Sequence, residues 1–94
     1  MSAGISNASC ITAADEVLAS AFGEEIVVLN LRSGVYYTLD EVAAKVWTLI
    51  ASPSRVSAIR DAIVSEYDVD PMRCEHDIRE LIQTLASHGL VTVT

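Results

Sequence analysis

The amino-acid sequence predicts an α+β fold in which a three-stranded antiparallel sheet is followed by three helices. Residues 17–39 are rich in β-branched side chains and contain glycine turns, as expected for consecutive hairpins. From Asp40 onward, apolar residues recur every three or four positions, which is the period of an amphipathic helix. A sheet with one apolar face can cover a helix cluster, and the same order of elements describes a winged helix-turn-helix.

The strands are expected at Val17–Phe22, residues 25–31 and Val35–Leu39. The middle segment, EIVVLNL, has the strongest strand signal because β-branched residues are frequent in it. Gly34 suits the tight turn before the last strand. Short turns between consecutive strands favour an antiparallel meander.

The helices that follow are bounded by recognisable capping residues. Asp40 is a good N-cap for the first helix, and the second lies between two breaks that contain proline. Asp70 followed by Pro71 is a strong start signal for the third helix. Gly89 suits the position just after its end, and residues 90–93 form a short extended tail.

With 94 residues, the chain has room for one domain. Residues 1–16 hold small polar side chains with little pattern. We therefore expect a poorly ordered N-terminal segment at residues 1–16 and a single domain at residues 17–94.

The charge balance is acidic, with 13 Asp and Glu against 6 Lys and Arg and a net charge of −7. Nucleic acids and anionic membranes both attract Lys and Arg, so the composition argues against both partners. The chain has no apolar run of the roughly 20 residues that span a bilayer, and its first residues lack the pattern of a secretory signal. We therefore expect a cytoplasmic protein in which Cys10 and Cys74 are reduced thiols.

The sequence carries no nucleophile elbow, no glycine-rich phosphate loop and no His-Glu-x-x-His motif. We therefore expect no enzyme, no catalytic residues and no cofactor. Cys74 and His76 form part of a zinc-like pattern, but positions two apart on a helix point about 200° apart, so we expect no metal site. His88 falls in the last helical turn, where a partial positive charge is favourable.

Tyr36 and Tyr37 are adjacent in the third predicted strand, so they face opposite sides of it. One interpretation is an ordinary pair, with one tyrosine in the core and the other at the surface. The other interpretation is an aromatic edge strand, whose unpaired N–H and C=O groups accept an added peptide strand.

The third predicted helix carries a polar stripe, Arg73, Asp77, Glu80 and Thr84, at helical spacing. One interpretation is a solvated face with ion pairs between successive turns. The other is the polar wall of a groove beside the edge strand.

The order and spacing of several segments resemble the PqqD-like family. The resemblance covers about residues 17–93 and rests on VLNLRSGVYYTLD at 28–40, Val46-Trp47, EYDVD at 66–70, DIRELI at 77–82 and LASHGLV at 85–91. It is closest to the stand-alone members found with lasso peptide biosynthesis. Asp40 stands where the family often has Asn at the helix cap, and it keeps the capping role.

The resemblance implies a protein that recognises the leader peptide of a ribosomally made precursor without catalysing a reaction. The leader, which commonly contains Tyr-x-x-Pro, adds as an antiparallel strand to the third predicted strand, against the third helix. The acidic balance of this chain independently suits a basic leader. The protein then presents the precursor to a cysteine-protease-like leader peptidase, and a separate ATP-dependent cyclase closes the ring. Carried over, the peptide-binding residues are Val35, Tyr36, Tyr37, Thr38, Arg73, Asp77, Glu80 and Leu81.

Two other functions fit the same order of elements. A winged-helix DNA-binding regulator is one, although the carboxylates of the third helix repel phosphate. A structural module that dimerises through a self-paired edge strand is the other.

Overall fold

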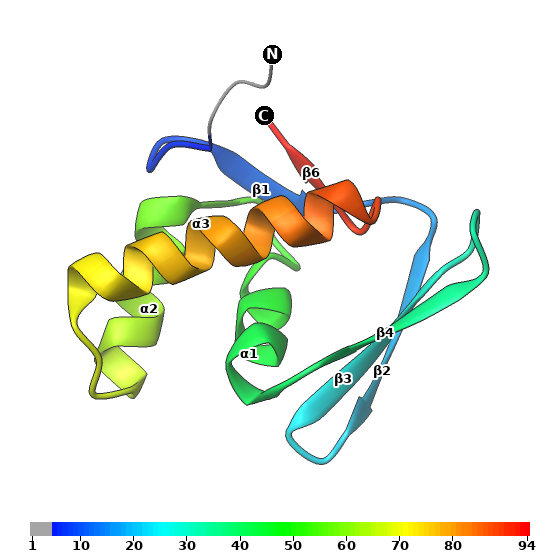
Figure 1. Ribbon diagram of the computed structural model, residues 1–94, viewed down its shortest axis with the longest axis horizontal. Coiled ribbons are helices and arrows are strands. Elements are labelled where there is room, and N and C mark those ends of the chain that lie inside the picture. Colours follow the sequence, from blue (N-terminus) through cyan, green and yellow to red (C-terminus); the bar gives the residue numbers. More distant parts are fainter. Residues whose placement is uncertain (1–4) are drawn as a thin grey trace.

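The structure is a computed structural model that describes residues 5–94 (Figure 1). It contains three helices and two small antiparallel sheets, one in the order β2-β3-β4 and the other in the order β5-β1-β6. The predicted α+β fold, with a three-stranded sheet followed by three helices, is confirmed.

The first sheet is the predicted meander. It consists of β2 (Val17–Phe22), β3 (Glu25–Asn30) and β4 (Val35–Leu39), so the third strand of the sequence analysis is β4. Gly34 has φ +73°, which a four-residue turn between β3 and β4 needs at its last position. Val28 pairs with Tyr37 across β3 and β4 and is fully buried, so this face of the sheet lies on the core.

The three helices are α1 (Glu41–Leu49), α2 (Val56–Glu66) and α3 (Pro71–Ser87). Helices α1 and α3 begin at the predicted capping residues, and α2 lies between the two predicted breaks. The Asp40 carboxylate accepts a hydrogen bond from the Ala43 N–H at 3.0 Å, and Asp70 caps α3 in the same way. The helix α2 packs beside α3, while α1 packs against β3 and β4.

The chain after α3 turns sharply at Gly89, which has φ +73°. Leu90 N–H donates to the Leu85 carbonyl at 2.9 Å and Gly89 N–H to the Ala86 carbonyl at 3.0 Å, as in a Schellman motif. Leu90 is fully buried. The turn therefore ends α3 at a fixed place and directs the chain into β6.

The second sheet was not expected from the sequence. It joins β1 (Cys10–Ala13), β5 (Ser54–Arg55) and β6 (Val91–Val93), and in Figure 1 the strands β1 and β6 lie side by side. Ile11 in β1 is fully buried. For residues 10–13 this corrects the prediction of a poorly ordered segment, since both edges of β1 are paired; residues 1–4 of that segment lie outside the described residues.

The N-terminal segment also completes α2. The N-cap residue, Arg55, makes no side-chain capping bond. Instead, the N–H groups of Val56 and Ser57 donate to the backbone carbonyls of Ser9 and Asn7 at 3.1 and 3.2 Å. Backbone carbonyls from a distant segment thus satisfy donors that a helix N-terminus leaves unpaired.

Within residues 5–94, no helix combines the length and the apolar character needed to cross a membrane.

Candidate functional site

The strand β4 has one unpaired edge in the described structure. Its neighbour in the sheet is β3, and β3 has β2 on its other side. Leu31 N–H donates to the Glu16 carbonyl at 2.9 Å, which extends the β2–β3 ladder and fixes which residues are hydrogen bonded along it. By this alternation Tyr37 bonds to β3, while Tyr36 and Thr38 direct their N–H and C=O groups to the free edge.

The two tyrosines have different environments. Tyr36 is 67% exposed and lies on the outer face of the sheet. Tyr37 is half-buried against the core, and its ring centroid lies 4.5 Å from that of His88 at the end of α3. The interpretation of one inward and one outward tyrosine therefore holds, and the inward one touches the helix wall.

A hollow separates β4 from the C-terminal half of α3. Its lining comes from the β4 strand, from the start of α1 and from α3; the residues are Tyr36, Tyr37, Thr38, Leu39, Asp40, Ala43, Leu81, Thr84, Leu85 and His88. The free backbone edge and the helix wall thus face one open space, in which an extended peptide has both hydrogen-bonding groups and apolar surface beside it.

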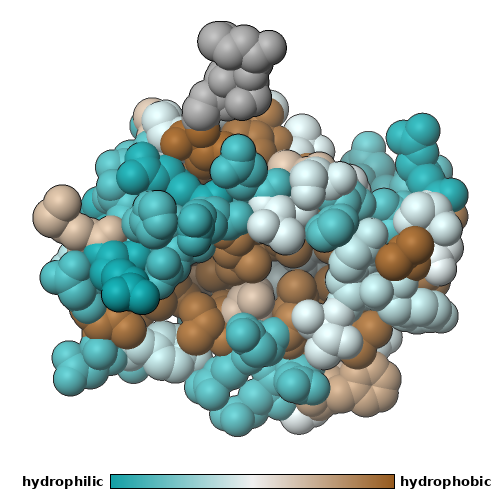
Figure 2. Space-filling model, viewed as in Figure 1, coloured by the Kyte–Doolittle hydropathy of each residue, from teal (hydrophilic) through white to brown (hydrophobic). Residues whose placement is uncertain are grey.

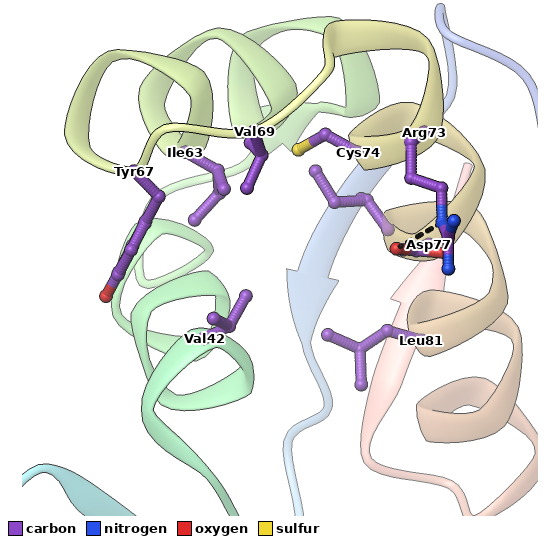
Figure 3. Close-up of a pocket in the computed structure, with 9 residues that line it drawn as sticks. Val42, Ile63, Tyr67, Val69, Arg73, Cys74, Asp77 and Leu81 are labelled. Atoms are coloured by element: carbon purple, nitrogen blue, oxygen red, sulfur yellow. Dashed lines mark ion pairs between the residues drawn. The ribbon is translucent and has the colours of Figure 1, made fainter.

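A second, more apolar cavity of about 210 Å³ lies between α1 and the N-terminal half of α3 (Figure 3). Its lining is Val42, Ile63, Tyr67, Val69, Arg73, Cys74, Asp77, Ile78 and Leu81. Leu81 lines both hollows, so we treat them together as the groove. Figure 2 shows apolar surface in the recess between α3 and α1.

Charged groups lie at the border of the apolar cavity. Arg73 and Asp77 are 3.7 Å apart and largely exposed, and Figure 3 shows this ion pair on one side of the cavity. An exposed pair of this kind contributes little to stability. Its side chains are therefore free to reorient towards a bound peptide at small cost.

The structure brings together most of the predicted site residues. Tyr36, Tyr37 and Thr38 line the hollow beside β4, while Arg73, Asp77 and Leu81 line the apolar cavity. Val35 and Glu80 line neither hollow. Glu80 instead lies 3.5 Å from His76 on the solvent side of α3.

Several groove residues were not predicted from the sequence. Val42 and Val69 are about 40% exposed (42% and 41%) and border the apolar cavity, one from α1 and one from the loop before α3. The only signal that could have pointed to Val69 is its position as an apolar residue between two aspartates, in Asp68-Val69-Asp70. His88 was assigned to the helix end, but its stacking on Tyr37 depends on the tertiary fold.

Two ionisable groups in the cavity favour their neutral forms. The pKa of Tyr67 is raised to about 12, mainly by partial burial and secondly by the 3.1 Å hydrogen bond from its hydroxyl to Glu41. Burial and the nearby Asp77 carboxylate raise the pKa of the Cys74 thiol. Both groups are therefore uncharged near neutral pH, which suits a cavity that binds apolar side chains.

One group in the described part of the chain has the side chains to approach a metal ion together. It consists of His76, Asp77 and Glu80, whose ligand atoms lie within 4.8 Å of one another. All three are exposed, and Asp77 and Glu80 already take part in ion pairs along α3. Cys74, which the zinc pattern considered above would need beside His76, is buried and is not part of this group.

Comparison with known proteins identifies the family and supports the fold. The family model for coenzyme PQQ synthesis protein D (PqqD) matches residues 25–91. A solved structure described as TbiB1 in complex with the TbiA(beta) leader peptide is 35% identical, with a TM-score of 0.82 over 85% of this chain and 93% of that one.

A second solved structure is described as lasso peptide synthetase B1 complexed with the leader peptide. It is 24% identical, with a TM-score of 0.79 over 87% of this chain and 96% of that one, and it supports the shared fold. A search of curated protein sequences gave no match. The family match covers most of the chain and confirms the resemblance noted in the sequence, and the chain therefore belongs to the PqqD family.

Proposed function

We propose that this protein binds the leader peptide of a ribosomally made precursor, and that it acts as a cytoplasmic recognition protein without catalysing a reaction. The observation that carries the proposal is the free edge of β4 beside an apolar groove. The TbiB1 structure, which holds a leader peptide and shares 35% identity with this chain, supports it.

Strand addition gives the bound peptide a direction. A peptide antiparallel to β4 exchanges hydrogen bonds with Tyr36 and Thr38 and has its N-terminal end near Asp40. That end lies beside α1, so residues preceding the added strand reach the apolar cavity. Main-chain bonds then set the register, and the cavity selects apolar side chains such as those of the expected Tyr-x-x-Pro element.

The binding test uses a labelled synthetic leader with Tyr-x-x-Pro, titrated with the protein and followed by fluorescence anisotropy. Thr38→Pro removes an N–H from the free edge, and we expect it to abolish saturable binding. Ala19→Pro is the matched control, because the same alternation places its N–H on the free edge of β2, away from the groove. Circular dichroism checks that both variants fold, and unchanged affinity of folded Thr38→Pro refutes strand addition.

The outer face of the same sheet supports a further part of the proposal, the transfer of the precursor to a leader peptidase. Leu18 pairs with Leu29, and Leu29 with Tyr36, which makes an apolar row across the three strands. Leu18 and Tyr36 are 58% and 67% exposed, and Phe22, on the same face four positions further along β2, is 64% exposed. A row of exposed, large apolar side chains is a candidate contact surface for a partner protein.

A leader strand added to β4 would extend this apolar face by its own outward side chains. We therefore assign the face to the cysteine-protease-like leader peptidase, which would contact sheet and leader together; the ATP-dependent cyclase acts afterwards. Leu18→Asp should weaken peptidase capture while leaving leader affinity unchanged, because Leu18 is remote from the groove. Equal peptidase capture by wild type and Leu18→Asp contradicts the assignment of this face.

A further inference from the structure

Asn30, at the end of β3, is the one polar side chain in residues 5–94 that is classed with the core, at 8% exposure. Its Nδ2 donates to the backbone carbonyl of His88 at 2.8 Å. Its Oδ1 accepts from the backbone N–H groups of Arg32 and Ser33 at 2.9 and 3.2 Å. A buried amide is stable when its polar groups are paired, and here both ends are used.

These bonds connect the two walls of the groove. Arg32 and Ser33 form the turn that leads into β4, the strand with the free edge. His88 is the C-cap residue of α3, the opposite wall. One planar side chain therefore joins segments that are 58 residues apart in the sequence.

The connection through Asn30 places the His88 ring beside β4. It lies 4.5 Å from the ring of Tyr37, and both residues line the hollow between β4 and α3. The carbonyl that Asn30 holds belongs to the same residue whose ring meets β4. Movement of the α3 end away from Asn30 would therefore separate this ring pair and widen the groove.

Gly89 leaves the space that Asn30 needs. A Cβ atom at Gly89 would lie 3.1 Å from Asn30 Nδ2, and the backbone there has φ +73°. The positive φ of the turn therefore favours glycine, and a Cβ at this position would press on the Asn30 amide. The end of α3 is built to receive this side chain.

From these contacts we infer that Asn30 is a positioning residue, which sets the spacing between β4 and α3 and hence the width of the groove that receives the leader. Its effect on leader affinity rests on the proposed function, whereas the spacing itself exists without a ligand. The role needs a donor and an acceptor on one planar group. An aspartate keeps the acceptor for the turn but turns a second oxygen towards the His88 carbonyl.

The test compares Asn30→Asp with wild type by two measurements. In the free protein, a nuclear Overhauser contact between the Tyr37 and His88 rings reports the spacing directly. With a labelled Tyr-x-x-Pro leader, anisotropy gives the Kd. Ser54→Ala is the matched control, because it removes hydrogen bonds to the Leu49 and Ser52 carbonyls on another part of the molecule.

We expect Asn30→Asp to fold, to lose the contact between the rings and to raise the Kd about tenfold, the size associated with about 1.4 kcal/mol. Ser54→Ala should keep both the ring contact and the wild-type Kd, even where its unfolding free energy falls. If Asn30 only stabilised the fold, Asn30→Asp and Ser54→Ala would affect the Kd alike, and the ring contact would remain in both folded variants.

If Asn30→Asp fails to fold, Asn30→Gln makes a second test, since it keeps a donor and an acceptor but moves the amide one carbon away from the positions that pair with the His88 carbonyl and the turn N–H groups. A retained ring contact and unchanged Kd in a folded variant overturn the inference. If wild type binds no leader, the proposed function fails, and the ring contact alone decides the role of Asn30.

Discussion

Replacing Ile11 with alanine tests the strand that the sequence does not predict. Ile11 lies in β1, is fully buried, and pairs with Ser54 on one side and Val93 on the other. The change removes about 2.4 kcal/mol of transfer free energy, at roughly 0.8 kcal/mol per carbon. The cavity left behind adds to this, so we expect the unfolding free energy to fall by about 3 kcal/mol.

That loss is large for this chain. At roughly 0.05–0.15 kcal/mol per residue, a domain of 94 residues has an unfolding free energy of about 5–14 kcal/mol. Urea denaturation followed by circular dichroism at a helical wavelength measures the difference. Leu18→Ala serves as the control, because Leu18 is 58% exposed and its truncation should change the unfolding free energy by no more than about 0.5 kcal/mol.

Equal unfolding free energies for Ile11→Ala and wild type refute the reasoning. They would mean that β1 is not docked in solution and that residues 1–16 form the poorly ordered segment expected from their composition. A fall of about 3 kcal/mol in the unfolding free energy supports the reasoning, because only a buried isoleucine costs that much to truncate. An intermediate loss, near 1 kcal/mol, also contradicts it, because a fully buried isoleucine cannot be truncated so cheaply.

Three further perturbations address α3 and the apolar cavity. Asp70→Ala removes the side chain that accepts from the Arg73 N–H at 2.9 Å, and urea denaturation should show a loss of about 1 kcal/mol. Burial and Glu41 raise the pKa of Tyr67 from 10.0 to about 12, so the stability that Tyr67 contributes falls as pH rises between these values, and absorbance titration should show one late tyrosine that Tyr67→Phe lacks. Burial raises the pKa of Cys74, so iodoacetamide should alkylate it faster in urea than in the folded protein.

The elements that the sequence predicts are those with local signals. The turn at Gly34, the start at Asp70-Pro71 and the end at Gly89 each depend on the conformational preference of a few neighbouring residues. The strand β1 has no such signal. It pairs with residues 54–55 and 91–93, more than 40 and 75 positions away, and its order comes from those partners.

The site follows the same division. The edge strand and the helix wall are visible as patterns, yet a helical pattern fixes direction only to within part of a turn. Glu80 lies three positions after Asp77, so it points about 60° away from it, enough to face His76 rather than the groove. In the sequence, Asn30 is a single polar residue in a predicted strand. Its role could not be predicted because it depends on the His88 carbonyl, 58 positions away.

Two substitutions can test whether leader affinity and the unfolding free energy depend on different residues. Ile11 lies in the buried core and lines neither hollow, so its truncation should lower the unfolding free energy while the remaining folded protein keeps its leader affinity. Asn30 joins the β3–β4 turn to the end of α3, so its change to aspartate should alter affinity in protein that is still folded. If both variants changed the two quantities in one fixed ratio, the width of the groove would be a consequence of global stability, and no single side chain could be said to set it.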